Sequence, residues 1–104
     1  MIDVAVAGAT GKLGSMVCSL VREQADMRLV GAVVSAEGGK AGTEICPGVK
    51  AVGPDGLEEL CHRCTVLVDV TNAAAAERNV PVAIKAGANV VVGTTGLSPV
   101  LLER

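Results

Sequence analysis

The sequence contains no phenylalanine, tyrosine or tryptophan among its 104 residues. Proteins that bind single-stranded nucleic acids stack the bases on such rings, and their absence argues against that activity. The net charge of −2, without a basic stripe, also argues against a phosphate polymer, so we expect no nucleic-acid partner. Half of the residues are nevertheless hydrophobic. We therefore expect one core of small and β-branched aliphatic side chains, which suit a parallel sheet covered by helices.

Targeting signals are missing as well. The N-terminal segment, which begins at Met1, has neither the positive charge of a secretory signal nor a small-residue cleavage site after an apolar core. No apolar run approaches the roughly 20 residues that a membrane span needs, so we expect no membrane partner. We expect Cys18, Cys46, Cys61 and Cys64 to be reduced thiols. Together these features predict a soluble, cytoplasmic protein.

The first third of the chain has the pattern of one βαβ unit. The apolar run Ile2–Ala7 ends at Gly8 and is typical of a buried strand. Helical spacing of apolar residues from Lys12 to about Ala25 predicts an amphipathic helix. Arg28–Ser35 is again apolar and β-branched, which predicts a second strand. The apolar positions of the expected helix are Leu13, Met16, Val17, Leu20 and Val21.

The remainder of the chain continues the alternation of strands and helices. Glycine and proline predict a loop over Glu37–Gly48, with a short strand after it at Lys50–Val52. Asp55 is expected to cap a short helix that ends near Cys61. The other expected elements are a strand at Val66–Val70, a helix at Ala73–Ala86 kinked or broken near Pro81 and stopped by Gly87, a strand at Asn89–Val92, and a helix that begins at Ser98 and Pro99.

This order of elements predicts an α/β fold, a Rossmann-type doubly wound parallel sheet in a single domain over residues 1–104. The last expected helix has barely two turns before Arg104, and its apolar residues would need a partner surface. We therefore expect a truncated dinucleotide-binding domain, a fragment of a longer protein. A short terminal helix in a complete small domain is the alternative.

Three glycines lie where the first strand meets the first helix. A pyrophosphate at Gly8, Gly11 and Gly14 would meet backbone N–H groups and the positive end of the helix dipole. Glycine is needed where a Cβ would block that approach, and the third glycine lets the helix pack closely on the strand. The spacing is G-x-x-G-x-x-G, with Ala9 at the usual second glycine. It indicates a phosphate loop, and a tight turn without a ligand is the alternative.

The residues around this loop leave the cofactor open as NADP or NAD. Lys12, the only cation of the loop, would either reach a phosphate or be solvated. The adenosine ribose is held at the end of the second strand, where an acid would favour NAD. Ser35 stands there instead, and with Lys12 and Lys40 nearby it permits NADP. Glu37 as the acid on the ribose is the rival interpretation.

Two later strands also end in polar loops, Asp69–Asn72 and Gly93–Gly96. Ligands of open α/β sheets lie beyond the carboxyl ends of the strands, so these loops and the glycine loop should face one crevice. The groups offered to a ribose or a carboxamide belong to Thr71, Gly93, Thr94 and Thr95. Alternatively, Thr71 or Asn72 caps a helix and Asp69 is a buried turn residue.

Cys61 and Cys64 form a single C-x-x-C pair around His62. Structural zinc usually takes two such pairs, so we expect no metal site. We expect His62, the only histidine, at the surface, and no catalytic residues in this chain.

Three segments resemble the N-terminal domain of the dihydrodipicolinate reductases (4-hydroxy-tetrahydrodipicolinate reductases) of lysine and diaminopimelate biosynthesis. Val6–Gly14 is similar to the family's G-A-x-G-[RK]-M-G loop, and Val68–Thr71 to its V-D-F-T. Val90–Gly96 is similar to its V-I-G-T-T-G. The resemblance covers the whole chain but less than half of the family's usual length. Val70 in place of phenylalanine, and Asn72-Ala73 without the family's proline, depart from the pattern.

The resemblance implies a role for each matching residue. The cofactor pyrophosphate would be held by Gly8, Ala9, Thr10, Gly11, Lys12 and Leu13. Ser35 would lie at the adenosine ribose, where the family often has an acid. The nicotinamide side would be lined by Thr71, Gly93, Thr94 and Thr95.

The resemblance also implies hydride transfer from NAD(P)H to a cyclic dicarboxylate by a homotetrameric full-length protein. The acid–base histidines and lysine of the family lie in its C-terminal domain, so this chain alone is expected to bind the cofactor without turnover. A short-chain dehydrogenase-like protein, an aspartate-semialdehyde dehydrogenase and a nucleotide-sensing Rossmann module are the alternatives. Gly93–Gly96 favours the reductase over the other two enzymes.

Overall fold

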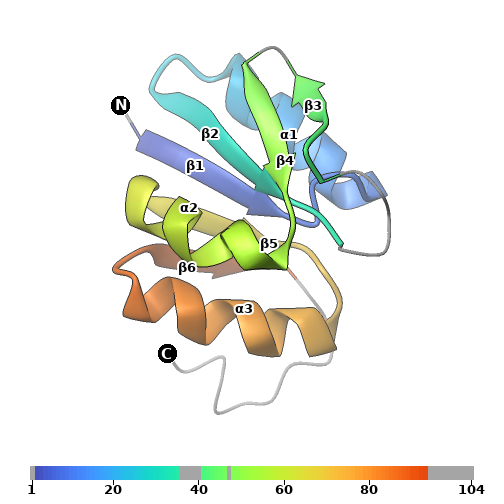
Figure 1. Ribbon diagram of the computed structural model, residues 1–104. Helices are drawn as coiled ribbons and strands as arrows, with labels where there is room; N and C mark the ends of the chain where they lie inside the picture. The colour runs from blue at the N-terminus through green and yellow to red at the C-terminus, as the bar shows by residue number, and fades with distance from the viewer. Residues whose placement is uncertain (1, 36–40, 47, 94–104) are drawn as a thin grey trace.

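The computed structural model describes residues 2–35, 41–46 and 48–93 (Figure 1). Its strands form one six-stranded sheet in the order β3-β4-β2-β1-β5-β6. The parallel strands are β1 (Ile2–Ala7), β2 (Met27–Val33), β4 (Val49–Val52), β5 (Val66–Asp69) and β6 (Asn89–Val92). A short edge strand, β3 (Glu44–Cys46), pairs with β4 in the antiparallel direction. Because the strand order runs outward in both directions from β1, the sheet is doubly wound as predicted.

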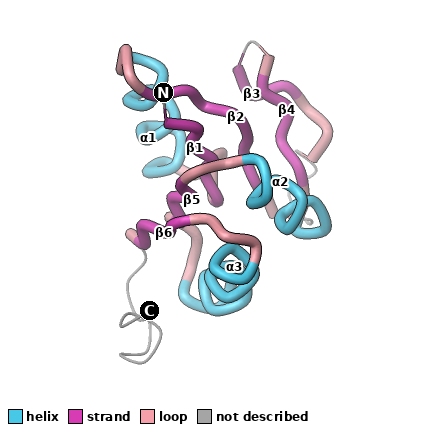
Figure 2. The backbone as a smooth tube through the Cα atoms, turned by 90° about the vertical axis from the view of Figure 1, so that its left-hand side faces the viewer, coloured by secondary structure: helices cyan, strands magenta, loops and turns pink. Residues whose placement is uncertain are grey.

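Helices cover both faces of this sheet. One face carries α1 (Lys12–Glu23), and the other carries α2 (Leu57–Arg63) and α3 (Ala73–Lys85), as Figure 2 shows in a side view. The central strand β1 contributes to the core on both sides. Its valines Val4 and Val6 pack in the cluster under α1, whereas its alanines pack in the cluster under α2 and α3. The core therefore contains no aromatic rings and consists of two clusters of small, mostly aliphatic side chains, one on each face of the sheet.

The buried face of α1 matches the expected one only in part: Val21 is buried and Val17 packs against the core, but the other three apolar positions are exposed. Gly14, Cys18 and Val21 face the sheet, while Leu13, Met16 and Leu20 are 48%, 55% and 55% exposed. The reason is the contact at Gly14, where an added Cβ would lie 1.8 Å from the carbonyl oxygen of Gly8. Only glycine permits this approach, so its position sets the rotation of the helix about its axis. The larger apolar residues lie on another face.

The loop expected over Glu37–Gly48 contains a strand in the structure. Residues Glu44–Cys46 form β3 beside β4. The pairing is extended by the Gly42 N–H, which donates to Ala51 O at 2.7 Å, and the Ala51 N–H, which donates to Thr43 O at 2.8 Å. A three-residue strand among glycines has no periodicity of its own. Its conformation is decided by hydrogen bonds to a neighbouring strand.

The boundaries of α2 also differ from the prediction. Asp55 does not cap the helix, because it lies within a 3₁₀ turn, η2 (Pro54–Gly56), and Gly56 takes the cap position without a side-chain hydrogen bond. An added Cβ at Gly56 would lie 2.8 Å from Val52, so the turn packs tightly on the end of β4. The helix continues beyond Cys61 to Arg63.

Pro81 does not interrupt α3, which runs continuously from Ala73 to Lys85. A proline removes one hydrogen bond to the residue four positions earlier, here Glu77. Both Pro81 and Glu77 are exposed, so water can bind the released carbonyl group. The buried residues Ala76, Val80 and Ala83 hold the other face of the helix on the sheet.

No helix in the described ranges is long and apolar enough to cross a membrane. The helix expected from Ser98 lies outside the described residues.

Candidate functional site

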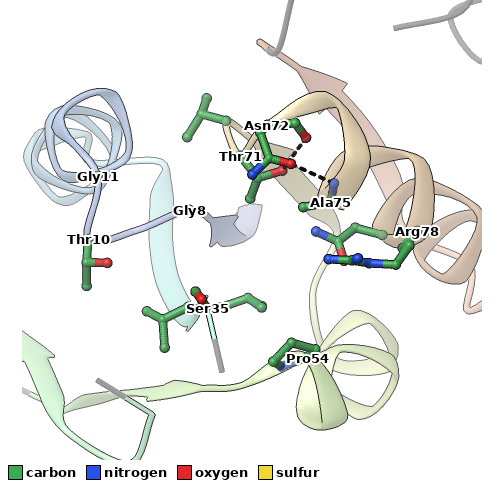
Figure 3. A pocket seen from close by; sticks show the side chains of 13 residues that line it. Gly8, Thr10, Gly11, Ser35, Pro54, Thr71, Asn72, Ala75 and Arg78 are labelled. Carbon is green, nitrogen blue, oxygen red and sulfur yellow. Dashed lines mark hydrogen bonds between the residues drawn. The ribbon is translucent and has the colours of Figure 1, made fainter. Parts of the chain in front are cut away.

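A cavity of about 360 Å³ opens at the carboxyl ends of the parallel strands (Figure 3). Its walls are the loop after β1, the end of β2, the turn after β4, and the loop after β5 with the first turns of α3. The glycine loop and the loop after β5 therefore face one cavity at this edge of the sheet, as predicted. Gly93, the described residue of the loop after β6, does not line it. The labelled lining residues are Gly8, Thr10, Gly11, Ser35, Pro54, Thr71, Asn72, Ala75 and Arg78.

The glycine loop packs tightly against its neighbours. Gly8 has a φ of +86°, and an added Cβ there would lie 3.1 Å from the Val70 backbone. Its N–H donates to Val33 O at 2.9 Å, which ties the loop to the end of β2. Gly14 brings α1 against the carbonyl group of Gly8, as described above. The predicted close packing of helix and loop is therefore confirmed for these two glycines.

The N-terminus of α1 lies at this cavity without a side-chain cap. Gly11 is the capping residue, has no side chain to offer, and lines the cavity. The first turn of α1 contains no acidic residue either. The N–H groups of a first helical turn have no partner within the helix, and the helix dipole makes this end positive. The arrangement favours an anion in the cavity.

The loop after β5 is held by one buried carboxylate. Asp69 is fully buried, and its Oδ1 accepts hydrogen bonds from the Thr71 backbone N–H, at 3.0 Å, and from the Thr71 hydroxyl. Its Oδ2 accepts from Asn79 Nδ2 of α3 at 3.2 Å. Asn72 caps α3 by accepting from the Ala75 N–H at 2.9 Å. Asp69 and Asn72 thus have the structural roles given above as the alternative, while Thr71 is bound to Asp69 and still lines the cavity.

The charge of the cavity comes from a residue that the sequence analysis missed. Of the described residues that line it, Arg78, on α3, is the only charged one. Ala75 and Asn79 of the same helix also line it and were missed too. Asn72, Ala75 and Arg78 are spaced three residues apart, so they share one face of α3. Counting in steps of three from the N-cap Asn72 could therefore have identified Ala75 and Arg78 from the sequence.

Other predicted site residues lie elsewhere. Ala9 is buried beside the sheet, whereas Lys12 and Leu13 are exposed, and none of the three lines the cavity. The Gly93 N–H donates to Asp69 O at 2.8 Å, which places the residue beside the β5 loop. Thr94, Thr95, Glu37 and Lys40 fall outside the described residues.

The C-x-x-C pair is part of the core. Burial raises the pKa of the Cys61 thiol to about 11, with a smaller contribution from Cys64, whose own pKa burial also raises. Neither forms a disulfide. Nucleophilic attack and metal binding need the thiolate, which these environments disfavour. His62 is exposed, as predicted, at 4.0 Å from a carboxylate oxygen of Glu58.

Comparison with known proteins assigns the family. The family model for the N-terminus of dihydrodipicolinate reductase matches residues 2–104. The chain belongs to the dihydrodipicolinate reductase family. It is similar to the 4-hydroxy-tetrahydrodipicolinate reductases of Methanopyrus kandleri, at 35% identity, and Methanobrevibacter smithii, at 41%. Each match covers 94% of this chain, but only 38% and 39% of the respective relative. The chain thus spans about two fifths of the length of these reductases.

A solved structure of the family has the same fold. The dihydrodipicolinate reductase from Paenisporosarcina sp. TG-14, in its dipicolinate-bound form, superposes with a TM-score of 0.81 at 24% sequence identity. The match covers 99% of this chain and 41% of that one. The Rossmann-type fold and the predicted family are confirmed, and the alternative families are not favoured.

Proposed function

We propose that the chain is the NAD(P)H-binding domain of a 4-hydroxy-tetrahydrodipicolinate reductase. The observation that carries the proposal is the cavity at the uncapped N-terminus of α1, next to Gly8 and Gly11. A pyrophosphate there would accept hydrogen bonds from first-turn N–H groups and lie at the positive end of the helix dipole. Bound NAD(P)H would supply the hydride, while this chain binds and orients it.

Individual residues take roles along the length of the dinucleotide. The segment from Gly8 to Leu13 would hold the pyrophosphate, mostly through its backbone, with Lys12 reaching it from the first turn of the helix. Ser35 would contact the adenosine ribose, because it lies at the end of β2 in the same cavity. Thr71, with Gly93, Thr94 and Thr95 after β6, would line the nicotinamide side. The fixed Asp69–Thr71 contact supports this role by orienting the Thr71 hydroxyl.

Reduction of the substrate would need more than this domain. The family's reductases are more than twice as long as the matched segment, and we propose that a C-terminal domain binds the cyclic dicarboxylate and carries the catalytic residues. The dipicolinate bound to the Paenisporosarcina enzyme supports that substrate class. We further propose a homotetramer for the full-length protein, a cytoplasmic location, and no turnover by residues 1–104 alone.

Calorimetry with NADPH and with NADH tests the cofactor site. The protein is expected to bind at least one of them, and Gly11→Val is expected to abolish this binding. An added Cβ at Gly11 meets only the Gly8 carbonyl oxygen, at 3.4 Å, so the variant should fold while its side chain fills the cavity. Far-UV circular dichroism should therefore be unchanged.

Ser19→Val, at an exposed position later in α1, is the matched control and should bind as the wild type does. The proposal fails if neither cofactor binds the wild type at millimolar concentration, or if Gly11→Val leaves the affinity unchanged.

A further inference from the structure

Arg78 has no ionic partner among the described residues, and it lines the cavity proposed to hold the cofactor. No hydrogen bond or ion pair joins its guanidinium to any residue in the described parts of the chain. Among the residues that the structure describes, no carboxylate lines the cavity; Asp69 is fully buried and accepts hydrogen bonds from Thr71 and Asn79. The N-terminus of α1 and the Arg78 guanidinium thus provide positive groups on two different walls of the cavity.

The position of Arg78 is set by its neighbour in the chain. Asn79 is buried, and its amide donates to Asp69 Oδ2 at 3.2 Å. This contact, together with the Asn72 cap, fixes how α3 is rotated against the end of β5. Arg78, one residue before Asn79, is thereby directed to the rim of the cavity. Figure 3 shows it across the cavity from Thr10 and Gly11 and above Pro54, with Ser35 below Gly8.

The position of the α1 N-terminus indicates where each part of the dinucleotide would lie. If the pyrophosphate lies at the N-terminus of α1, the adenosine ribose lies at the end of β2, next to Ser35. An acidic residue there would bind the 2′-hydroxyl and repel a 2′-phosphate. Ser35 repels neither and can donate a hydrogen bond. Arg78 lies across the cavity from Ser35, on the side away from the pyrophosphate loop.

We propose, on the basis of the proposed cofactor site, that Arg78 selects NADP(H) over NAD(H) by pairing with the 2′-phosphate of the adenosine ribose. The 2′-phosphate is the only group that distinguishes the two cofactors, and it carries close to two negative charges at neutral pH. Guanidinium matches phosphate geometry with two parallel hydrogen bonds and is always charged. The Ser35 hydroxyl donates to the same phosphate from the end of β2.

Arg78→Gln tests this assignment by calorimetry with NADPH and NADH. Wild type is expected to bind NADPH more tightly. The variant should lose about 10- to 100-fold in NADPH affinity, as expected for a charged hydrogen bond, and less than about threefold in NADH affinity. Lys85→Gln removes another α3 cation, which lines a different groove, and should leave both affinities unchanged.

Adenosine 2′,5′-bisphosphate and 5′-AMP isolate the adenosine end and should show the same contrast. Equal weakening of NADPH and NADH in Arg78→Gln would overturn the proposal, because it would indicate contact with the adenine or the pyrophosphate. Equal binding of both cofactors by wild type would overturn it as well. Failure of the wild type to bind either cofactor would instead refute the proposed function. The same titrations therefore distinguish that failure from a failure of the Arg78 assignment.

Discussion

Asp69 organises the site although it has no exposed surface. It is the last residue of β5, and its carboxylate accepts hydrogen bonds from Thr71 in the following loop and from Asn79 in α3. A buried carboxylate is costly unless its oxygens are hydrogen-bonded, and both Oδ1 and Oδ2 are. Its value lies in fixing the loop and the rotation of α3, which place Thr71 and Arg78 at the cavity.

Gly14 allows α1 to approach the carbonyl group of Gly8 because it has no Cβ. Gly14→Ala is expected to destabilise the protein by about 1–3 kcal/mol or more, because the new Cβ would lie 1.8 Å from a backbone oxygen that cannot move alone. Urea denaturation measures the loss.

Gly11→Ala is the matched control, since its nearest new contact is 3.4 Å. It should cost less than about 1 kcal/mol, the value of a poorer helix cap. Equal losses for the two variants would contradict the assigned role of Gly14.

At the scale of elements, α1 shows how a single contact overrides an amphipathic pattern. Of the expected apolar positions, Val21 is buried and Val17 packs on the core, but Leu13, Met16 and Leu20 are exposed. Gly14 and Cys18 are buried in their place. Burial of the larger residues would require the helix to rotate and move away from the end of β1. The close approach at Gly14 prevents that.

Val21→Ala is therefore expected to lower the free energy of unfolding by about 1–3 kcal/mol, because Val21 is 6% exposed in the cluster under α1. Met16→Gln and Leu20→Gln, on the exposed face, should each change it by less than about 0.5 kcal/mol. Chemical denaturation of the three variants makes the comparison. A large loss for Met16→Gln or Leu20→Gln would show that α1 is rotated differently.

At the scale of the whole molecule, stability should depend on the protonation of its buried thiols. The pKa of Cys61 is raised to about 11 in the folded protein, above the ordinary 9.0, because burial disfavours the thiolate. The neutral thiol therefore stabilises the fold fully below about pH 9. This contribution is lost as the pH rises towards 11, since the unfolded chain releases the proton first.

Urea denaturation from pH 8 to pH 11, with reductant, should show a loss of about 2 kcal/mol attributable to this thiol. Cys61→Ala should be less stable at pH 8 but should lose less over this range. Leu57→Ala, in the same cluster, is the control for the cavity and should keep the wild-type pH dependence. An unchanged pH dependence in Cys61→Ala would contradict the prediction. The chain contains no tyrosine, which would otherwise titrate in the same range.

The order of the major elements, the fold class and the family could all be predicted from residue patterns along the chain. Each rests on local signals: apolar runs for β1, β2, β5 and β6, and glycines where a Cβ would collide. Such patterns can be recognised without knowing what lies nearby in space. The glycine loop, the end of β2 and Thr71 were accordingly found as lining of one cavity.

Features that depend on contacts between distant segments could not be predicted in this way and became clear from the folded structure. The strand β3 exists through pairing with β4, and α1 takes its rotation from the Gly8–Gly14 contact. Arg78 reaches the cavity because Asn79, the next residue, is bound to Asp69 ten positions earlier. Hydrogen-bond partners and close approaches across the fold carry no periodic signal in one chain. These contacts form only when the helices and strands pack together, so they depend on residues that are far apart in the sequence.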